Sequence, residues 1–127
     1  MEKSEVAAWL DRYVEAWRSY ERERIVDLFT HDAVQRYRPH EEPVVGAEAI
    51  ADSWLGDRDD PGSYEAEYEP IAVDGDTAVA TGTSTYTHPD GSVRAIYDNC
   101  FVLRFDADGR CSEFTEWFIE RPASPGA

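Results

Sequence analysis

The stretch of sequence that decides the fold is YDNCFVLRFDADGRCSEFTEW, residues 97–117. Aromatic and other apolar residues recur through both of its halves, and the turn-forming residues 106–109 (Asp-Ala-Asp-Gly) separate them. This pattern predicts an antiparallel hairpin made of strands at 93–105 and 110–120. Neighbouring side chains of a strand point to opposite faces of the sheet, so the order of residues along each strand predicts which of them face inward.

The rest of the chain divides into helical and strand-like segments. Apolar residues recur at helical spacing in three segments, which are residues 4–19, 21–29 and 46–55. A strand-like composition is found in three further segments, which are residues 33–38, 64–69 and 77–87. Helices that precede a run of strands joined by short turns indicate the α+β class. We therefore predict a curved antiparallel sheet on which three N-terminal helices pack.

Length and composition limit the classes of function. A chain of 127 residues suits one domain with one core, which we assign to residues 1–121, followed by a short flexible tail at 122–127. The formal net charge of −15 would repel phosphate backbones and anionic lipid, so we expect no nucleic-acid and no membrane partner. No segment has the pattern of a signal peptide or the length of a membrane-spanning helix, and we expect a cytoplasmic protein.

The sequence predicts neither a metal site nor a cofactor. Its three histidines show no spacing typical of metal ligands. Cys100 and Cys111 form no CxxC motif, and both lie in strand-like segments, where a free thiol usually packs as a small apolar side chain.

The first predicted helix carries an aromatic stripe, because Trp9, Tyr13 and Trp17 stand four residues apart. Side chains with this spacing share one face of a helix. We expect Trp9 and Trp17 to pack the helix onto the sheet. For Tyr13 the spacing leaves two alternatives, a place in the core or a hydroxyl group exposed to a cavity.

Three stretches resemble the NTF2-like superfamily, and in particular its SnoaL-like members. They are RYVEAWRSYERERIVDLFTHDAV at 12–34, PVVGAEAI at 43–50 and the hairpin at 97–117. The resemblance implies a cone-shaped α+β barrel that is often a homodimer through the outer face of its sheet. Ketosteroid isomerase, polyketide cyclases and limonene epoxide hydrolase share this fold, so function must be argued from the site.

Ketosteroid isomerase provides a residue-by-residue comparison. Tyr13 matches the helix tyrosine that donates a hydrogen bond to the developing enolate in that enzyme. Tyr37 stands where the resemblance implies the general-base carboxylate, and Phe101 stands where it implies a protonated aspartic acid. Steroid isomerisation requires the base, so we predict that this chain is not a steroid isomerase.

Strand alternation singles out Glu116 as the candidate acid or base. If Phe101 faces the cavity, the inward set in the hairpin is Asn99, Phe101, Phe114, Glu116 and Phe118. A carboxyl group among aromatic side chains has a raised pKa and can transfer protons near neutral pH. A one-residue bulge would turn Asp98 inward in place of Glu116. Alternatively, Glu116 forms an ion pair with Arg36 or Arg94 that closes the barrel and has no catalytic role.

Further residues are expected around the same pocket. These candidates for binding are Gln35, Tyr37, His40 and Trp54, with Tyr64 and Tyr68 as additional aromatic residues. His40 follows Pro39 in a loop that should lie near the cavity mouth, and its ordinary pKa suits proton transfer. The number of aromatic residues favours a small apolar or polar-aromatic organic ligand.

Three functions are consistent with these residues. The first is a cofactor-independent isomerase, cyclase or hydrolase, in which Glu116 is the acid or base and Tyr13 and Asn99 donate hydrogen bonds. The second is a ligand-binding or accessory dimer without catalysis, with Trp117 at the interface on the outer face of the sheet. The third, a protein-interaction module, is disfavoured by the strongly acidic composition.

Overall fold

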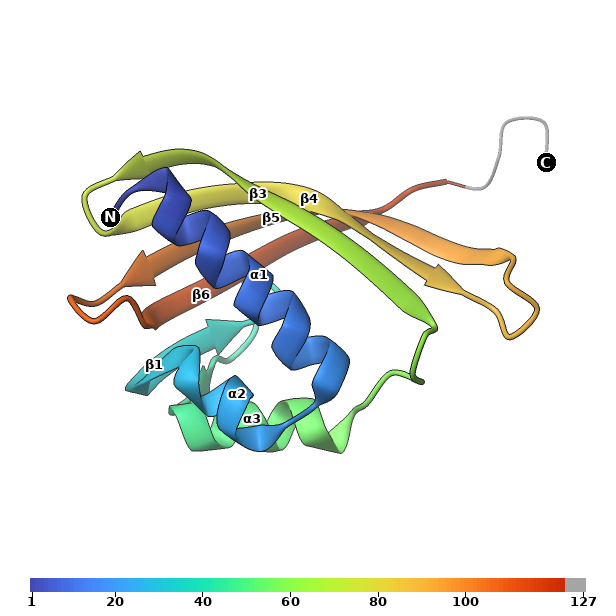
Figure 1. The fold of residues 1–127 in the computed structure, drawn as a ribbon, viewed down its shortest axis with the longest axis horizontal. Coiled ribbons are helices and arrows are strands. Elements are labelled where there is room, and N and C mark those ends of the chain that lie inside the picture. The colour runs from blue at the N-terminus through green and yellow to red at the C-terminus, as the bar shows by residue number, and fades with distance from the viewer. Residues whose placement is uncertain (123–127) are drawn as a thin grey trace.

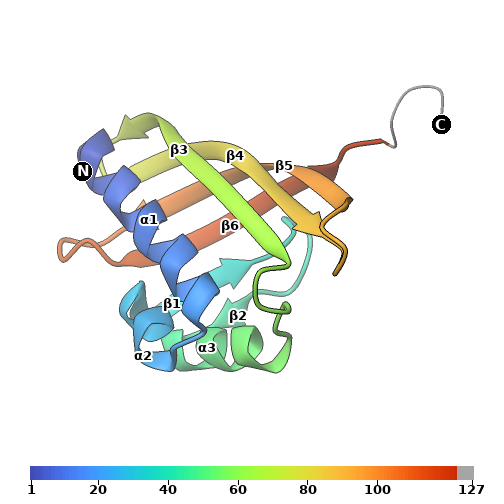
Figure 2. The same ribbon diagram turned by 45° about the vertical axis from the view of Figure 1, so that its right-hand side comes forward.

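The computed structural model describes residues 1–122 and has three helices beside one sheet (Figures 1 and 2). The helices are α1 (Lys3–Ser19), α2 (Arg22–Asp27) and α3 (Ala47–Gly56). The strands are β1 (Phe29–Arg36), β2 (Val44–Val45), β3 (Tyr64–Asp74), β4 (Thr77–Thr87), β5 (Val93–Phe105) and β6 (Cys111–Glu120). The predicted α+β class is confirmed. The predicted tail at 122–127 lies outside the described residues except for Pro122.

The six strands form one curved sheet in the order β2-β1-β6-β5-β4-β3. All neighbouring strands are antiparallel except β1 and β6, which are parallel. The sheet does not close into a barrel, because β2 and β3 remain its two edges. Figures 1 and 2 show α1 lying across the concave face, with α2 and α3 gathered beside β1. No helix among residues 1–122 is long and apolar enough to cross a membrane.

The largest boundary differences from the sequence prediction lie at the start of β1 and at the end of β3. The second helix ends at Asp27 and does not reach Phe29, which instead begins β1 opposite Cys111. The Phe29 ring is buried in the core, so strand pairing and burial outweigh the helical spacing of this short segment. The strand predicted at 64–69 continues through Pro70 to Asp74, which an edge strand permits because its outer side needs no backbone donor.

An aromatic layer joins α1 to the sheet, and we define it as Trp9, Tyr13, Trp54, Phe101 and Phe114. The ring centroid of Tyr13 lies 5.2 Å from that of Trp54, 5.5 Å from that of Phe114 and 5.6 Å from that of Trp9. All five side chains are buried. Each such ring pair contributes about 0.5–1.5 kcal/mol beyond the burial of apolar area. The layer therefore fixes α1 on the sheet at the position of Tyr13.

The two tryptophans of the α1 stripe have different environments. Trp9 is fully buried, and its indole Nε1 donates a hydrogen bond to the Leu28 carbonyl oxygen at 3.0 Å. Trp17 stacks on Tyr64 with 4.3 Å between ring centroids, and the Tyr64 hydroxyl group donates to the Trp17 carbonyl oxygen at 2.8 Å. The stripe therefore begins in the core and ends at the edge of the sheet formed by β3.

Gly82 in β4 allows a close approach between neighbouring strands. A Cβ atom at this position would overlap the Glu67 carbonyl oxygen and lie 2.6 Å from Cδ1 of Tyr68. Because Gly82 has no side chain, the Tyr68 ring can lie directly over β4. The ring packs against Phe101 with 4.7 Å between centroids.

Replacement of Gly82 should show how tightly this strand crossing is packed. We expect Gly82→Ala to lower the free energy of unfolding by about 1–3 kcal/mol, because Tyr68 and the β3 backbone must shift. Urea denaturation monitored by circular dichroism measures the effect. The matched control is Gly56→Ala in α3, where a Cβ atom meets nothing within 4 Å and helix propensity favours alanine. Equal stability of wild type and Gly82→Ala would contradict the prediction.

Candidate functional site

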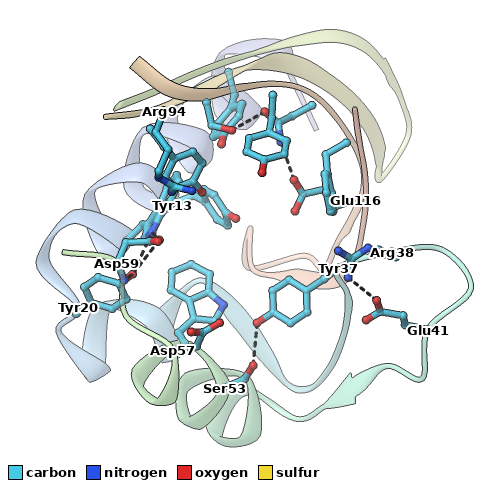
Figure 3. Close-up of a pocket in the computed structure, with 18 residues that line it drawn as sticks. Tyr13, Tyr20, Tyr37, Arg38, Glu41, Ser53, Asp57, Asp59, Arg94 and Glu116 are labelled. Atoms are coloured by element: carbon cyan, nitrogen blue, oxygen red, sulfur yellow. Dashed lines mark hydrogen bonds and ion pairs between the residues drawn. The ribbon is translucent and has the colours of Figure 1, made fainter. Parts of the chain in front are cut away.

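A cavity of about 570 Å³ opens between the concave face of the sheet and the helices (Figure 3). Its aromatic lining residues are Tyr13, Trp17, Tyr20, Tyr37, Trp54, Tyr68, Tyr86, Tyr97 and Phe118. Its polar and charged lining residues are Arg38, Glu41, Ser53, Asp57, Asp59, Ser84, Arg94, Asn99 and Glu116. The aromatic layer lies at the base of this space. The volume is in the range typical of sites for small organic ligands.

Three polar side chains from successive strands form a hydrogen-bonded row on the cavity wall. The Ser84 hydroxyl group on β4 donates to Asn99 Oδ1 on β5 at 2.9 Å. Asn99 Nδ2 in turn donates to Glu116 Oε2 on β6 at 2.7 Å. The row fixes the orientation of the Asn99 amide, because its oxygen faces a donor and its nitrogen faces an acceptor. Glu116 is thereby held at the cavity in one orientation.

Burial raises the pKa of Glu116 from its ordinary value of 4.5 to about 7. The apolar surroundings disfavour the charged carboxylate, and this effect exceeds the opposing influence of the Asn99 hydrogen bond and the Arg38 charge. A carboxyl group with this pKa is divided between its acid and base forms at neutral pH. Glu116 can therefore accept or donate a proton under physiological conditions.

Tyr13 presents its hydroxyl group to the same space. Burial, with a smaller contribution from the Glu116 charge, raises the pKa of Tyr13 well above its ordinary value, so the phenol stays protonated. Among residues 1–122 the Tyr13 hydroxyl group has no hydrogen-bond partner. Figure 3 shows Tyr13 and Glu116 pointing into the cavity from different sides. The pair offers a hydrogen-bond donor and a proton acceptor to one bound molecule.

Tyr37 and Ser53 form a second polar contact on the side of α3. Their hydroxyl oxygens are 3.0 Å apart. Burial raises the pKa of Tyr37 as well, so this phenol is also a neutral donor or acceptor at neutral pH.

Several charged groups at the cavity mouth already have partners within the protein. Arg38 Nη1 lies 2.7 Å from Glu41 Oε1, and its guanidinium group lies over the Phe118 ring. Asp59 Oδ2 accepts hydrogen bonds from the Trp17 indole at 3.1 Å and from the Tyr20 hydroxyl group at 3.4 Å. The two hydrogen bonds to Asp59 hold the loop after α3 against the C-terminal end of α1.

Six of the candidate site residues singled out from the sequence reach the cavity wall besides Tyr13, namely Tyr37, Trp54, Tyr68, Asn99, Glu116 and Phe118. Asp98, the alternative to Glu116, lies on the outer face, where Arg121 binds its two oxygens at 2.9 and 2.8 Å. The pairing of Phe101 with Glu116 sets this register. Neither Arg36 nor Arg94 forms an ion pair with Glu116 among residues 1–122.

The structure places five of the candidate lining residues away from this cavity wall, among them Tyr64, which stacks on Trp17. Phe101 and Phe114 are fully buried in the aromatic layer and contribute no cavity surface. Gln35 is also fully buried, because Trp54 Nε1 donates to its Oε1 at 3.1 Å behind the wall. His40 is exposed in a loop that directs its neighbour Arg38 toward the mouth and leaves the imidazole in solvent.

Sequence reasoning missed Ser84 and Asp59, and it named Arg94 as an alternative ion-pair partner of Glu116 and not as a binding residue. Strand alternation in residues 77–87 would have placed Ser84 on the inner face with Ala78 and Ala80. The charged mouth residues Asp59 and Arg94 come from a loop and from the start of a strand, where alternation carries no information. No group of three or more His, Cys, Asp or Glu side chains among residues 1–122 is arranged to hold a metal ion.

The fold and the cavity define a cone-shaped α+β protein with a ligand-sized site between its helices and its sheet. Residues 10–114 match the SnoaL-like domain family, and the chain belongs to this family. The resemblance inferred from the sequence is thus confirmed. Membership supports the binding of small molecules in general.

Comparison with solved structures supports the same fold. The chain is similar to an NTF-2 like protein of unknown function from Burkholderia xenovorans, with a TM-score of 0.72 and 14% sequence identity. The match covers 99% of this chain and 91% of that chain. At this identity the likeness concerns the fold alone. A search of curated proteins finds no match.

The raised pKa of Glu116 makes a prediction about stability. The folded state binds its proton more tightly than the unfolded state, so this stabilising contribution is present below about pH 4.5 and is lost as the pH rises through about 7. At pH 8 we expect Glu116→Gln to be more stable than wild type by about 1–3 kcal/mol, with the difference vanishing near pH 4. Urea denaturation at both pH values measures it.

The control for this prediction is Glu113→Gln, which removes an exposed carboxylate from the outer face of the same strand. We expect this variant to change the pH dependence of stability by less than about 0.5 kcal/mol. A pH-independent effect of Glu116→Gln would show that the carboxyl group titrates with an ordinary pKa.

Proposed function

We propose that this SnoaL-like domain, acting as one unit over residues 1–121, is a cofactor-independent enzyme that isomerises, cyclises or hydrolyses a small organic molecule by acid–base chemistry. The observation that carries the proposal is the position of Glu116, a carboxyl group with a pKa of about 7 on the wall of an aromatic-lined cavity. Groups with such pKa values in clefts are concentrated at catalytic sites.

In the proposed mechanism, the carboxylate of Glu116 removes a proton from the substrate, or in hydrolysis from a water molecule that attacks the substrate. The resulting acid returns the proton to another atom of the same molecule or, in hydrolysis, to the leaving group that the water displaces. The hydroxyl group of Tyr13 donates a hydrogen bond to the substrate oxygen that gains negative charge. Asn99 acts as a positioning residue, since its oxygen and nitrogen are engaged by Ser84 and Glu116. Protons and electrons balance within the substrate and Glu116 for isomerisation and cyclisation, and with one added water molecule for hydrolysis.

Steroid isomerisation does not fit this proposal. Tyr37 and Phe101 carry no carboxyl group, and Phe101 is enclosed in the aromatic layer beneath the cavity. The candidate base, Glu116, lies on β6 and not near the end of β1, where the comparison with ketosteroid isomerase would place it. The base would therefore reach the substrate from another side of the cavity. We therefore propose a substrate other than a steroid enone.

Ligand binding without turnover is a second candidate. It is favoured by the hydrogen bonds that the polar lining side chains make among themselves, which are the Ser84–Asn99–Glu116 row and the Tyr37–Ser53 contact. In that case the polar row would maintain the shape of the cavity, and a ligand would be held mainly by the aromatic walls.

Variants of Glu116 distinguish catalysis from binding alone. Polyketide-like, terpenoid and steroid-like compounds would first be screened by thermal shift, and binders would then be incubated with wild type and analysed for product by mass spectrometry. We expect Glu116→Gln to lower turnover by about 10²–10⁴-fold while the variant still binds the compound, because the proton acceptor is lost and the shape is kept. Wild-type turnover that survives in Glu116→Gln would refute the assignment of Glu116.

We also propose that the protein is a homodimer through the outer face of the sheet. Trp117 and Ile119 on β6 expose 45% and 73% of their surfaces on this face. Large exposed apolar side chains, and tryptophan in particular, are typical of protein interfaces.

Light scattering coupled to size-exclusion chromatography tests the dimer. We expect wild type to elute at twice the 14.4 kDa mass of the chain and Trp117→Glu to be at least about ten-fold weaker in self-association, since the charge would be buried in the interface. His40→Ala, an exposed change away from this face, is the control. A monomeric wild type at 0.1 mM would refute the proposal.

A further inference from the structure

Arg94 is aimed at the cavity by a bulge at the start of β5. Tyr86 pairs with Ala95 and Thr87 pairs with Val93, so Arg94 is the extra residue without an opposite partner in this ladder. In regular alternation Arg94 would point to the outer face, because Ala95, Tyr97 and Asn99 take the inner positions. Bulges re-aim side chains in this way. The Arg94 guanidinium group accordingly lies over the Tyr86 ring, 5.0 Å from its centroid, and lines the cavity.

The guanidinium group of Arg94 has no carboxylate within 4.0 Å among residues 1–122. Seven of the eleven arginines form ion pairs, whereas Arg94 shares the lack of one with Arg12, Arg36 and Arg58 among residues 1–122. The stacked position over Tyr86 leaves the edge of the guanidinium group, which carries its N–H donors, available to a bound molecule.

The acidic residues of the cavity have different partners. Glu41 is paired with Arg38, Asp59 accepts two hydrogen bonds from aromatic donors, and Glu116 is partly protonated at neutral pH. Asp57 remains, and Figure 3 shows it on the α3 side of the cavity, away from Arg94. Of the two arginines that line the cavity, Arg38 is paired with Glu41, and among residues 1–122 Arg94 has no carboxylate within 4.0 Å.

We propose that the ligand is a planar aromatic organic anion whose carboxylate or phenolate group binds to Arg94 at the mouth while its ring system enters between the aromatic walls toward Glu116. A guanidinium edge matches a carboxylate with two parallel hydrogen bonds. Tyr86 and Tyr97 flank the anion site, and Trp17 faces the ring system. Figure 3 shows Arg94 and Glu116 on different sides of the cavity, so one molecule would be anchored at one end and protonated or deprotonated at the other.

This inference rests on the proposed function and adds the substrate class. It also explains how one site can contain both Glu116 and a bound anion. The negative group is held at the mouth, where it is partly hydrated, and the atom that exchanges a proton lies deeper, where burial keeps the carboxyl group near neutrality.

Calorimetric titration with two matched probes, 2-naphthoate and its neutral analogue 2-naphthamide, tests the anion site. At pH 6 and low salt, where Glu116 is mostly protonated and the naphthoate is ionised, we expect wild type to bind the naphthoate at least about five-fold more tightly than the amide. Arg94→Gln should bring the two affinities within about two-fold of each other and leave amide binding unchanged. Arg12→Gln, an exposed arginine of α1 that does not line the cavity, should behave as wild type.

The outcomes separate this inference from the proposed function. Equal binding of both probes to wild type would overturn the anion site and leave the cavity as a binding site for neutral molecules. A naphthoate preference that persists in Arg94→Gln would also overturn it, because another cation would then hold the carboxylate. Binding of neither probe would overturn the inference as well, whereas the role of Glu116 is decided by the turnover of Glu116→Gln.

Discussion

The packing of rings around Tyr13 is the interaction on which the rest of the structure depends. The aromatic layer holds α1 across the concave face of the sheet, and so determines where the cone is filled and where it stays open. The same rings supply the apolar surroundings in which Glu116 is desolvated. Fold stability and the proton affinity of the candidate acid or base therefore come from a single cluster of side chains.

The polar row from Ser84 through Asn99 to Glu116 shows how the sheet tolerates a carboxyl group beside this cluster. Each member comes from a different strand, and each has a hydrogen-bond partner. A buried polar group without partners costs free energy, and a connected row reduces that cost without removing it. The part of this free-energy cost that the row does not remove is seen in the raised pKa of Glu116. Ionisation of this side chain therefore destabilises the folded state. Such a cost is common where a side chain is retained for function.

Much of the fold could be predicted from the sequence, because periodicity reports directly on burial. The hairpin at 97–117 specified which residues face inward, and its alternation placed Asn99 and Glu116 on the concave face. The errors have physical reasons. The segment around Phe29 has helical spacing but pairs with β6, and Phe101 faces inward yet lies too deep to touch the cavity. The bulge at Arg94 breaks alternation, and nothing in the local sequence marks it.

The parallel pairing of β1 with β6 has a consequence for how the molecule assembles. Gln35 of β1 pairs with Phe114 of β6. The first strand to be synthesised therefore gains this neighbour only when the last strand of the chain has been made. Contacts between such distant segments form late, because a long loop must close before they can stabilise anything. The helix that carries Trp54 follows β1 and docks with it. During synthesis, the space that would receive a ligand is therefore completed only when the final strand is added, because β6 joins β1 to the rest of the sheet.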